Sequence, residues 1–303
     1  MSICGATRGH RVPRLQLWNG TAGHRSLNYA GDGVNQWKVK SNRMINIGIG
    51  GVFGRMGREI VIAAGFSSDI TIVGGVVRPG SANSESVRYD FPVSSNPHDI
   101  VARSDVFIDF SLPEALEHHL EVCLNADAPY LSGVTGLGAE HRKQLTEASA
   151  RIAVFYAANF SIGVAVMTEL VRLAAAWMPD ADVEVIDLHH RRKRDAPSGT
   201  ALSLMESVES GRPTVERHRV AGRSGTGPRQ PGEIGVHSLR GGGNTGEHRV
   251  LFASEGEEVW LGHRALNRAT FADGALQAAQ WLVVQPSGFY GMRDLVAERA
   301  TAL

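Results

Sequence analysis

The fifteen residues from 187 to 201 combine side chains that could perform acid–base chemistry on a small acidic molecule. His189 and His190 can gain or lose a proton near neutral pH, and Lys193 follows four residues after the first of them. Pro197 and Ser198 favour the start of a helix, whose free N–H groups bind anions such as carboxylates. The stretch therefore suits a carboxylate-bearing substrate that must receive a proton.

Two elements must position these side chains. Alternating apolar residues over Val183–Leu188 predict a strand before them, and the spacing of Leu202–Val208 predicts a helix after them. The alternative is a solvated loop, because a run of charges such as residues 191–194 is often exposed to water. On this stretch alone both interpretations stay open.

Length and composition indicate a folded chain. With 303 residues, 43% hydrophobic and 20% charged, the chain is long enough for two domains and can build a core. It has no run of the roughly 18 apolar residues that a membrane span needs, so we expect no membrane partner. Cys4 and Cys123 are the only cysteines. They offer neither a disulfide framework nor a zinc set, so we expect a cytoplasmic protein.

The first 43 residues differ in charge from the rest of the chain. Basic and acidic residues number 31 each, but residues 1–43 hold seven basic residues and one acid. The remaining chain is mildly acidic, which argues against nucleic-acid binding. We expect residues 1–43 to be disordered. They could be a transit-type segment, but we favour a natural start at Met44, which directly opens the first predicted strand.

A glycine-rich turn predicts nucleotide binding near residue 50. The strand Ile45–Ile49 is followed by glycines at 51, 54 and 57 and then by a helix over Arg58–Ala64. Strand, glycine turn and helix in this order open a dinucleotide-binding fold, although the spacing departs from the usual G-x-G-x-x-G.

A second strand, Ile70–Val77, ends about 20 residues beyond the glycine turn. A site selective for NAD usually places an acid there to bind the ribose hydroxyls, and an arginine there can pair with the 2′-phosphate of NADP. The chain has Val77 and Arg78 at this point, which favours NADP. The alternative is a solvated arginine in the turn before Pro79.

Strands and helices alternate up to residue 177. Further strands are predicted at Val106–Phe110, Tyr130–Ser132 and Ile152–Tyr156, and helices at Glu114–Leu124, Ala139–Ala150 and Val164–Trp177. This alternation is typical of a doubly wound parallel sheet, whose ligands bind at the carboxyl ends of the strands.

The pattern changes after residue 211. We expect a long loop over Gly211–Gly232, three strands at Ile234–Arg240, Glu247–Ala253 and Glu257–His263, a helix over Ala269–Val284 and a tail over Gly288–Leu295. The turns between the three strands are too short for crossover helices, so these strands should be antiparallel. Two architectures in one chain imply a cofactor domain and a substrate domain.

Six motifs occur in a fixed order along the chain: 51–57 (GVFGRMG), 107–111 (FIDFS), 157–161 (AANFS), 189–201 (HHRRKRDAPSGTA), 246–248 (GEH) and 291–294 (GMRD). Together they resemble the 4-hydroxy-tetrahydrodipicolinate reductase family, which acts in lysine and diaminopimelate synthesis. The resemblance covers Met44 to about Leu295, and the fourth motif is its most specific part.

The resemblance implies an α/β fold with two domains. A Rossmann-type doubly wound parallel sheet would occupy 44–160, and a smaller α+β substrate-binding and tetramerisation domain with a mixed, largely antiparallel sheet would occupy 161–267. Residues 268–303 would return to the first domain, and the protein would be a homotetramer.

The resemblance also implies a nicotinamide cofactor, and Val77 with Arg78 favours NADPH over NADH. The cofactor-binding positions carried over are Gly51, Val52, Phe53, Gly54, Arg55, Met56, Val77, Arg78, Gly133, Val134, Thr135, Ala157, Ala158, Asn159 and Phe160. Two of them depart from the family pattern, because Val134 replaces a usual threonine and Val77 replaces the acid of dual-specificity members.

By the same resemblance, His189 is the proton donor and Lys193 a second acid. His190 with Ser198, Gly199 and Thr200 would hold the two carboxylates of a small dicarboxylate substrate. Hydride would pass to the substrate ring as its 4-hydroxyl leaves as water. We expect no metal, because no third ligand lies at a plausible spacing from the two histidines.

Three other functions fit parts of the sequence. A non-catalytic NADP-binding sensor would not need His189 and Lys193, and a dehydrogenase of a related amino or imino acid would not need the carboxylate turn. A nucleic-acid binder would depend on the basic start, which has few aromatic residues. We also hypothesise that the loop after Gly211 closes over the substrate.

Overall fold

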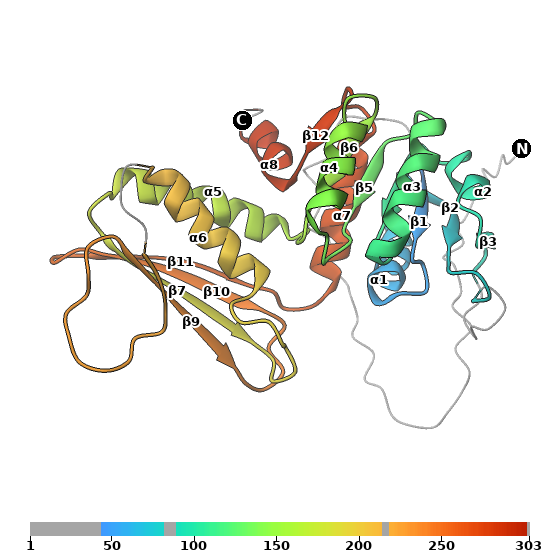
Figure 1. Ribbon diagram of the computed structural model, residues 1–303. Helices are drawn as coiled ribbons and strands as arrows, with labels where there is room; N and C mark the ends of the chain where they lie inside the picture. The colour runs from blue at the N-terminus through green and yellow to red at the C-terminus, as the bar shows by residue number, and fades with distance from the viewer. Residues whose placement is uncertain (1–43, 82–88, 214–217, 302–303) are drawn as a thin grey trace, which may run out of the picture.

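The computed structural model describes residues 44–81, 89–213 and 218–301. The extension expected to be disordered, residues 1–43, lies outside them. The described chain forms two lobes, each built on its own sheet, and the lobes lie side by side (Figure 1).

Seven strands form the first sheet in the order β12-β6-β5-β4-β1-β2-β3, and every pairing is parallel. They are β1 (Ile45–Gly50), β2 (Ile70–Val76), β3 (Val93–Ser94), β4 (Val106–Asp109), β5 (Tyr130–Ser132), β6 (Ala153–Tyr156) and β12 (Gly288–Tyr290). The order reverses between β1 and β4, which is where a Rossmann-type sheet opens its ligand-binding crevice. The predicted doubly wound sheet is confirmed.

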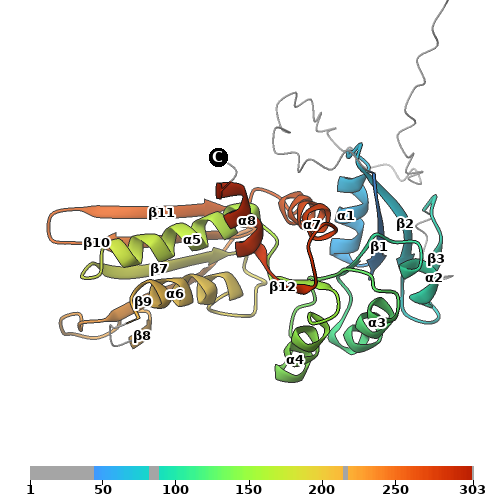
Figure 2. The ribbon, with the colours of Figure 1, turned by 90° about the horizontal axis from the view of Figure 1, so that it is seen from above.

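Helices cover both faces of the first sheet, as Figure 2 shows. α1 (Arg55–Ala64) and α7 (Ala269–Leu282) pack on one face, and α3 (Pro113–Asn125) and α4 (Ala139–Ala148) pack on the other. Each face of the sheet has its own hydrophobic core. In β4, Ile108 packs into the core on the α7 side and its neighbour Phe107 packs into the core on the α3 side. Sequence analysis missed β3 and α2 (His98–Val101), because neither is long enough to show a periodic pattern.

The glycine turn lets α1 begin close to β1. The helix starts at Arg55, three residues before the predicted start. Gly51 has a φ of +73°, which favours glycine. A Cβ at Gly57 would lie 2.4 Å from the carbonyl oxygen of Gly51, so the helix could not approach the turn with any larger residue. The three-residue spacing of these glycines follows from this packing.

Five strands form the second sheet in the order β11-β10-β7-β9-β8. They are β7 (Asp182–His189), β8 (His218–Ala221), β9 (Glu233–Arg240), β10 (Glu247–Ala253) and β11 (Glu258–Arg264). β10 is antiparallel to both β7 and β11, whereas β9 is parallel to β7 and β8. The sheet is therefore mixed.

Two details of this sheet correct the sequence analysis. β9 does not pair with β10, as expected for antiparallel neighbours, but lies parallel to β7. The reason is that α6 (Gly199–Gly211) and the segment after it form the long crossover that a parallel pair requires. β8 lies inside the segment expected to be loop, where glycine, arginine and proline mask its pattern.

Helices α5 (Ile162–Trp177) and α6 cover one face of the second sheet. In Figure 1 no described helix lies on the other face, where Trp260 and Leu239 are each about half exposed. The predicted tail contains β12 and a helix, α8 (Met292–Thr301), which packs against α5. No helix among the described residues is long and apolar enough to cross a membrane.

Candidate active site

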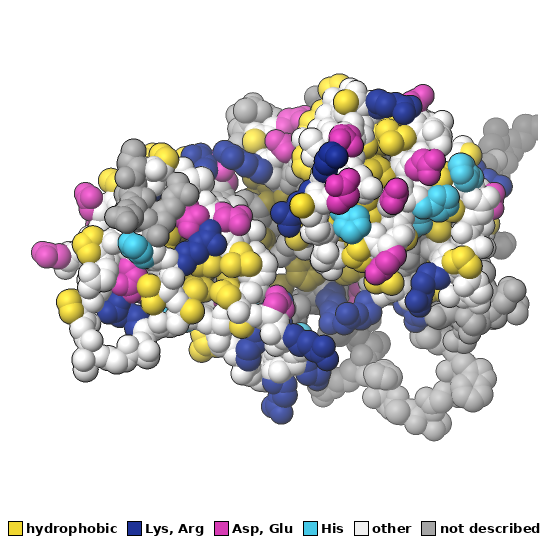
Figure 3. All heavy atoms as spheres, in the orientation of Figure 1, with side chains coloured by type: hydrophobic (Ala, Val, Ile, Leu, Met, Phe, Trp, Pro, Cys, Tyr) yellow, Lys and Arg dark blue, Asp and Glu magenta, His cyan; other side chains and the backbone are white. Residues whose placement is uncertain are grey.

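A cleft of about 930 Å³ lies between the two lobes. The turns after β4, β5 and β6 line one side, and the end of β7 with the start of α6 lines the other. Figure 3 shows the hollow between the lobes, with Lys and Arg side chains gathered near its lower edge. The carboxyl ends of the first sheet therefore face the stretch in which acid–base chemistry is predicted.

Eight of the predicted cofactor-binding residues line this cleft: Arg55, Met56, Gly133, Thr135, Ala157, Ala158, Asn159 and Phe160. The turn after β4 also lines it through Phe110, Ser111 and Leu112, to which sequence analysis assigned no role. Their position at the switch point of the sheet could have revealed them. Asp109 shapes this turn, since its Oδ1 accepts a hydrogen bond of 2.9 Å from the Ser111 N–H.

The other predicted cofactor-binding residues lie outside the lining of the cleft: Gly51, Val52, Phe53, Gly54, Val77, Arg78 and Val134. The side chains of Val52, Val77 and Val134 are buried in the core, so only the backbone at these positions is available to a nucleotide. Arg78 is exposed just beyond the end of β2. The replacement of threonine by Val134 therefore removes no hydroxyl from the cleft.

All six predicted catalytic and substrate-binding residues line the cleft: His189, His190, Lys193, Ser198, Gly199 and Thr200. Ser198 caps α6, because its Oγ accepts a hydrogen bond of 3.2 Å from the Ala201 N–H. The first N–H groups of α6 have no partner within the helix and suit a carboxylate. His190 Nδ1 accepts a hydrogen bond of 3.2 Å from the Arg192 N–H. Its proton is therefore on Nε2, which can donate to an anion.

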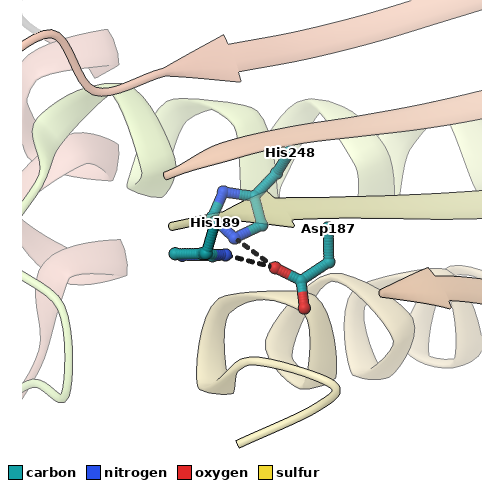
Figure 4. Close-up of side chains that lie close together, drawn as sticks. All are labelled: Asp187, His189 and His248. Atoms are coloured by element: carbon teal, nitrogen blue, oxygen red, sulfur yellow. Dashed lines mark ion pairs between the residues drawn. The ribbon is translucent and has the colours of Figure 1, made fainter. Parts of the chain in front are cut away.

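Asp187 is the buried centre of the second lobe's polar residues (Figure 4). Its Oδ1 lies 2.7 Å from His189 Nδ1 and 3.6 Å from His248 Nε2. The 2.7 Å contact has the length of a hydrogen bond, but neither atom has a well-aligned partner. Its Oδ2 accepts hydrogen bonds from the Ser198 N–H at 2.8 Å and from Arg240 at 3.0 Å. One carboxylate thus joins the predicted proton donor to the cap of α6.

Burial and charge shift the protonation of this group. Burial alone would raise the pKa of Asp187, but hydrogen bonds from Ser198 and Arg240 and the charge of His189 hold it below its usual value. Burial lowers the pKa of His189, and Asp187 offsets part of this effect. Burial also lowers the pKa of His248 to about 4. Asp187 is therefore charged and His248 neutral at neutral pH.

Asp187, His189 and His248 are also potential metal ligands. One ligand atom from each of Asp187, His189 and His248 lies within 4.8 Å of the others, a spacing that could hold one cation. Sequence spacing indicated no third ligand, but β10 brings His248 beside β7 and supplies one; the expectation of no metal stays a prediction. The guanidinium of Arg240 on the same carboxylate disfavours a further cation there.

Comparison with known proteins assigns the chain to a family. Residues 45–160 match the N-terminal part of dihydrodipicolinate reductase, and residues 163–296 match its C-terminal part. The chain belongs to the dihydrodipicolinate reductase family. It is 41% identical over 264 residues to 4-hydroxy-tetrahydrodipicolinate reductase of Rubrobacter xylanophilus, covering 84% of this chain and 99% of that protein.

Two further relatives are similar over most of their length. The reductase of Zymomonas mobilis is 42% identical over 258 residues, covering 83% of this chain and 97% of that protein. The dipicolinate-bound dihydrodipicolinate reductase of Paenisporosarcina sp. TG-14 superposes with a TM-score of 0.70 at 30% identity, covering 83% of this chain and 99% of that one. The predicted family, two-sheet fold and oxidoreductase class are confirmed.

In this member of the dihydrodipicolinate reductase family, sequence analysis gave three site residues no role. Arg240 joins the two ends of residues 187–195, donating to the backbone oxygens of Asp187 at 3.0 Å and Asp195 at 2.6 Å. His248 and Gly246 belong to the motif at 246–248. A Cβ at Gly246 would lie 3.0 Å from His189 Nε2. Only strand pairing, which the sequence does not display, brings these residues to the site.

Lys193 has a carboxylate partner in this family member. Its Nζ lies 3.0 Å from Asp195 Oδ2, and both residues line the cleft. The pKa of Asp195 is lowered, because hydrogen bonding and charge from Lys193 outweigh its partial burial. A carboxylate that enters the cleft therefore competes with Asp195 for Lys193.

The segment Gly211–Gly232 lies away from the cleft. None of its described residues lines the cleft. Arg229 pairs with Asp182 at 2.9 Å and contacts Glu184, at the opposite end of β7 from His189. The hypothesis that this segment closes over the substrate finds no support within one chain.

Proposed function

We propose that this protein is an NAD(P)H-dependent reductase of (2S,4S)-4-hydroxy-2,3,4,5-tetrahydrodipicolinate. The product is 2,3,4,5-tetrahydrodipicolinate, and the reaction belongs to lysine and diaminopimelate biosynthesis. One observation carries the proposal: a single cleft sets the strand ends of a Rossmann-type sheet opposite a histidine, a lysine and the start of helix α6. Membership of the dihydrodipicolinate reductase family supports it.

The first lobe fits a nicotinamide nucleotide. The turn at residues 51–57 can be tight only with glycine, and the N–H groups at the start of α1 suit a pyrophosphate. When bound, the reduced nicotinamide supplies a hydride. We propose that the turns at 133–135 and 157–160 orient the ring toward the second lobe. In this division of labour, residues 44–160 and 268–303 bind the cofactor and 161–267 bind the substrate.

The second lobe supplies the proton. The reaction takes up one hydride and one proton and releases one water, so an acid must stand beside the substrate ring. We assign this role to His189. Its burial lowers its pKa, so the protonated ring is a stronger acid than a free imidazolium. Lys193 serves as a second acid, and His190 with Ser198, Gly199 and Thr200 holds the carboxylates of a small dicarboxylate.

Arg78 supports a preference for NADPH over NADH. It is exposed just beyond the end of β2, and the buried Val77 beside it offers no carboxylate to a ribose. An Arg78→Ala variant should raise the KM for NADPH by about tenfold, on the order of one charge-assisted hydrogen bond, and leave the KM for NADH unchanged.

We further propose that the protein is a homotetramer joined through the open face of the second sheet. Trp260, Leu239 and Leu251 alternate along their strands with core residues, so they lie on the face that no described helix covers. An exposed apolar face of this kind marks an interaction surface. A Trp260→Asp variant should elute at lower mass than the wild type in size-exclusion chromatography with light scattering.

The decisive test is an assay of nicotinamide oxidation with freshly made 4-hydroxy-tetrahydrodipicolinate. We expect turnover with both cofactors and a higher kcat/KM with NADPH. Nucleotide binding without turnover would contradict the reductase assignment and favour a sensor. Turnover with a related imino acid alone would contradict the substrate.

A further inference from the structure

Asn159 lies where the two lobes meet, in the cofactor-side turn after β6. Its side chain nevertheless reaches the substrate side. Nδ2 donates a hydrogen bond of 3.0 Å to Thr200 Oγ1, on the first turn of α6. Oδ1 accepts a hydrogen bond of 2.8 Å from the Ser161 N–H. One amide therefore connects the turn expected to bind cofactor to the turn expected to bind a substrate carboxylate.

The orientation of this amide follows from its neighbours. A backbone N–H can only donate, so the amide oxygen must face Ser161 and the amide nitrogen must face Thr200. Thr200 Oγ1 then acts as the acceptor, and its own proton is left to donate elsewhere. Among the described residues, no acceptor for that proton is found, and Thr200 lines the cleft. The Thr200 hydroxyl proton is thus available to a ligand that enters the cleft.

The residue that binds the Asn159 amide oxygen, Ser161, belongs to the second lobe. Ser161 is buried and caps α5, its Oγ accepting a hydrogen bond of 3.2 Å from the Val164 N–H. The same Oγ lies 3.2 Å from Nε2 of His263, which belongs to β11 of the second sheet. Both hydrogen bonds of the Asn159 amide therefore join the turn after β6 in the first lobe to residues of the second lobe.

We propose that Asn159 is a positioning residue for the substrate: it orients the Thr200 hydroxyl toward a substrate carboxylate and couples substrate binding to the cofactor-side turn. This inference rests on the proposed function, in which Thr200 binds a dicarboxylate. A cofactor that contacts residues 157–160 restrains the turn that carries Asn159 relative to the second lobe, so it should tighten the binding of a dicarboxylate. By linkage, the dicarboxylate tightens binding of the cofactor by the same factor.

A double-mutant cycle between Asn159 and Thr200 tests the coupling. The measured quantity is the Kd of pyridine-2,6-dicarboxylate by titration calorimetry, with and without NADP⁺. Asn159→Ala and Thr200→Val should each weaken binding by about 3- to 10-fold, the range of one hydrogen bond. The double variant should be no weaker than Thr200→Val within about twofold, because Asn159 acts through Thr200. The gain in affinity on adding NADP⁺ should shrink in all three variants.

Further variants separate positioning from other effects. Thr200→Ser keeps a hydroxyl and should restore most of the affinity and the coupling. Asn96→Ala removes an exposed amide from the same lobe and should change neither Kd. Asn159→Ser keeps an acceptor for Ser161 but cannot reach Thr200, so it completes the cycle if the alanine variant does not fold. Far-UV circular dichroism and urea unfolding report folding in every variant.

Two results would overturn the inference. One is additivity of the two substitutions, which would mean that Asn159 and Thr200 act independently. The other is an Asn159→Ala variant with a raised KM for NADPH and an unchanged Kd for the dicarboxylate, which would make Asn159 a cofactor contact only. A wild-type protein that binds the dicarboxylate with this coupling but does not turn over would contradict the proposed function instead.

Discussion

Each lobe contains a buried Asp–His pair, and the two pairs differ in what surrounds them. In the first lobe, Asp109 Oδ2 is 2.8 Å from His119 Nδ1 and 2.7 Å from the Tyr130 hydroxyl. His119 does not line the cleft. In the second lobe, Asp187 is 2.7 Å from His189, but this contact is poorly aligned and His189 lies at the cleft.

The difference shows that residue type and burial alone do not mark a catalytic histidine. Both aspartates are fully buried and both have a lowered pKa, and for Asp109 the hydrogen bond and charge of His119 outweigh the burial that would raise it. The first pair has complete hydrogen bonds and stabilises a turn. The second pair has an incomplete set beside a cavity, which leaves His189 free to serve a ligand.

Replacing the two histidines should give opposite results. His189→Gln removes the proposed proton donor, so kcat should fall by about 10²- to 10⁴-fold with little loss of stability. His119→Gln leaves Asp109 short of a partner, so the free energy of unfolding should fall by about 1–3 kcal/mol while kcat stays within about threefold. Steady-state assays and urea unfolding measure the two effects. Equal losses of kcat would remove the distinction between the pairs.

Replacing Asp187 and Asp109 should distinguish the two Asp–His pairs further. Asp187→Asn presents an amide N–H to His189 Nδ1 and so favours the wrong tautomer, and kcat should fall by roughly 10²-fold. The charge of Asp187 raises the pKa of His189, so the alkaline limb of the pH profile should move to lower pH. Asp187→Glu should recover part of kcat. In contrast, Asp109→Asn should destabilise the fold and leave the pH profile unchanged; a shifted profile there would contradict us.

The neutral His248 should make stability depend on pH. Its folded pKa of about 4 lies below the usual value of 6.5, so the unfolded state binds more protons between these two values. Stability should therefore be fully present above about pH 6.5 and fall as the pH drops toward 4, by on the order of 3 kcal/mol in total. Urea unfolding at a series of pH values measures this slope. His248→Gln should flatten it, whereas His119→Gln should not.

The smallest expected effect concerns Tyr130, whose hydroxyl is the other hydrogen-bond partner of Asp109 Oδ2. Tyr130→Phe removes one donor to Asp109 and should lower the free energy of unfolding by about 1 kcal/mol. Activity should be unchanged, because Tyr130 is fully buried and does not line the cleft. A measurable loss of kcat in this variant would mean that the buried network of the first lobe also serves the reaction.

The sequence reveals those elements whose periodicity is long enough to show. The strands of the first sheet from β1 to β6 were predictable to within a residue or two, except the two-residue β3. β9 was found, but its neighbour was not, because pairing depends on the crossover through α6. β8 has four residues in a glycine- and arginine-rich segment, so local composition outweighs its pattern.

Some residues of the site could likewise be predicted from sequence and others could not. His189, Lys193 and Ser198 belong to one continuous motif, so their proximity could be predicted from sequence. Arg240 and His248 lie 53 and 61 residues beyond Asp187 in the chain and reach it only through the register of β9 and β10. The role of Asn159 depends on the side-chain contact between the lobes, which no local pattern encodes.

The last strand of the first sheet has a consequence for synthesis of the protein on the ribosome. β12 pairs with β6, and α7 packs on the same face of the first sheet as α1. The second sheet, in contrast, is complete at Arg264. The first lobe is therefore translated first but completed last. A polypeptide released after β11 would lack α7, so the apolar face of the first sheet that α7 covers would be exposed.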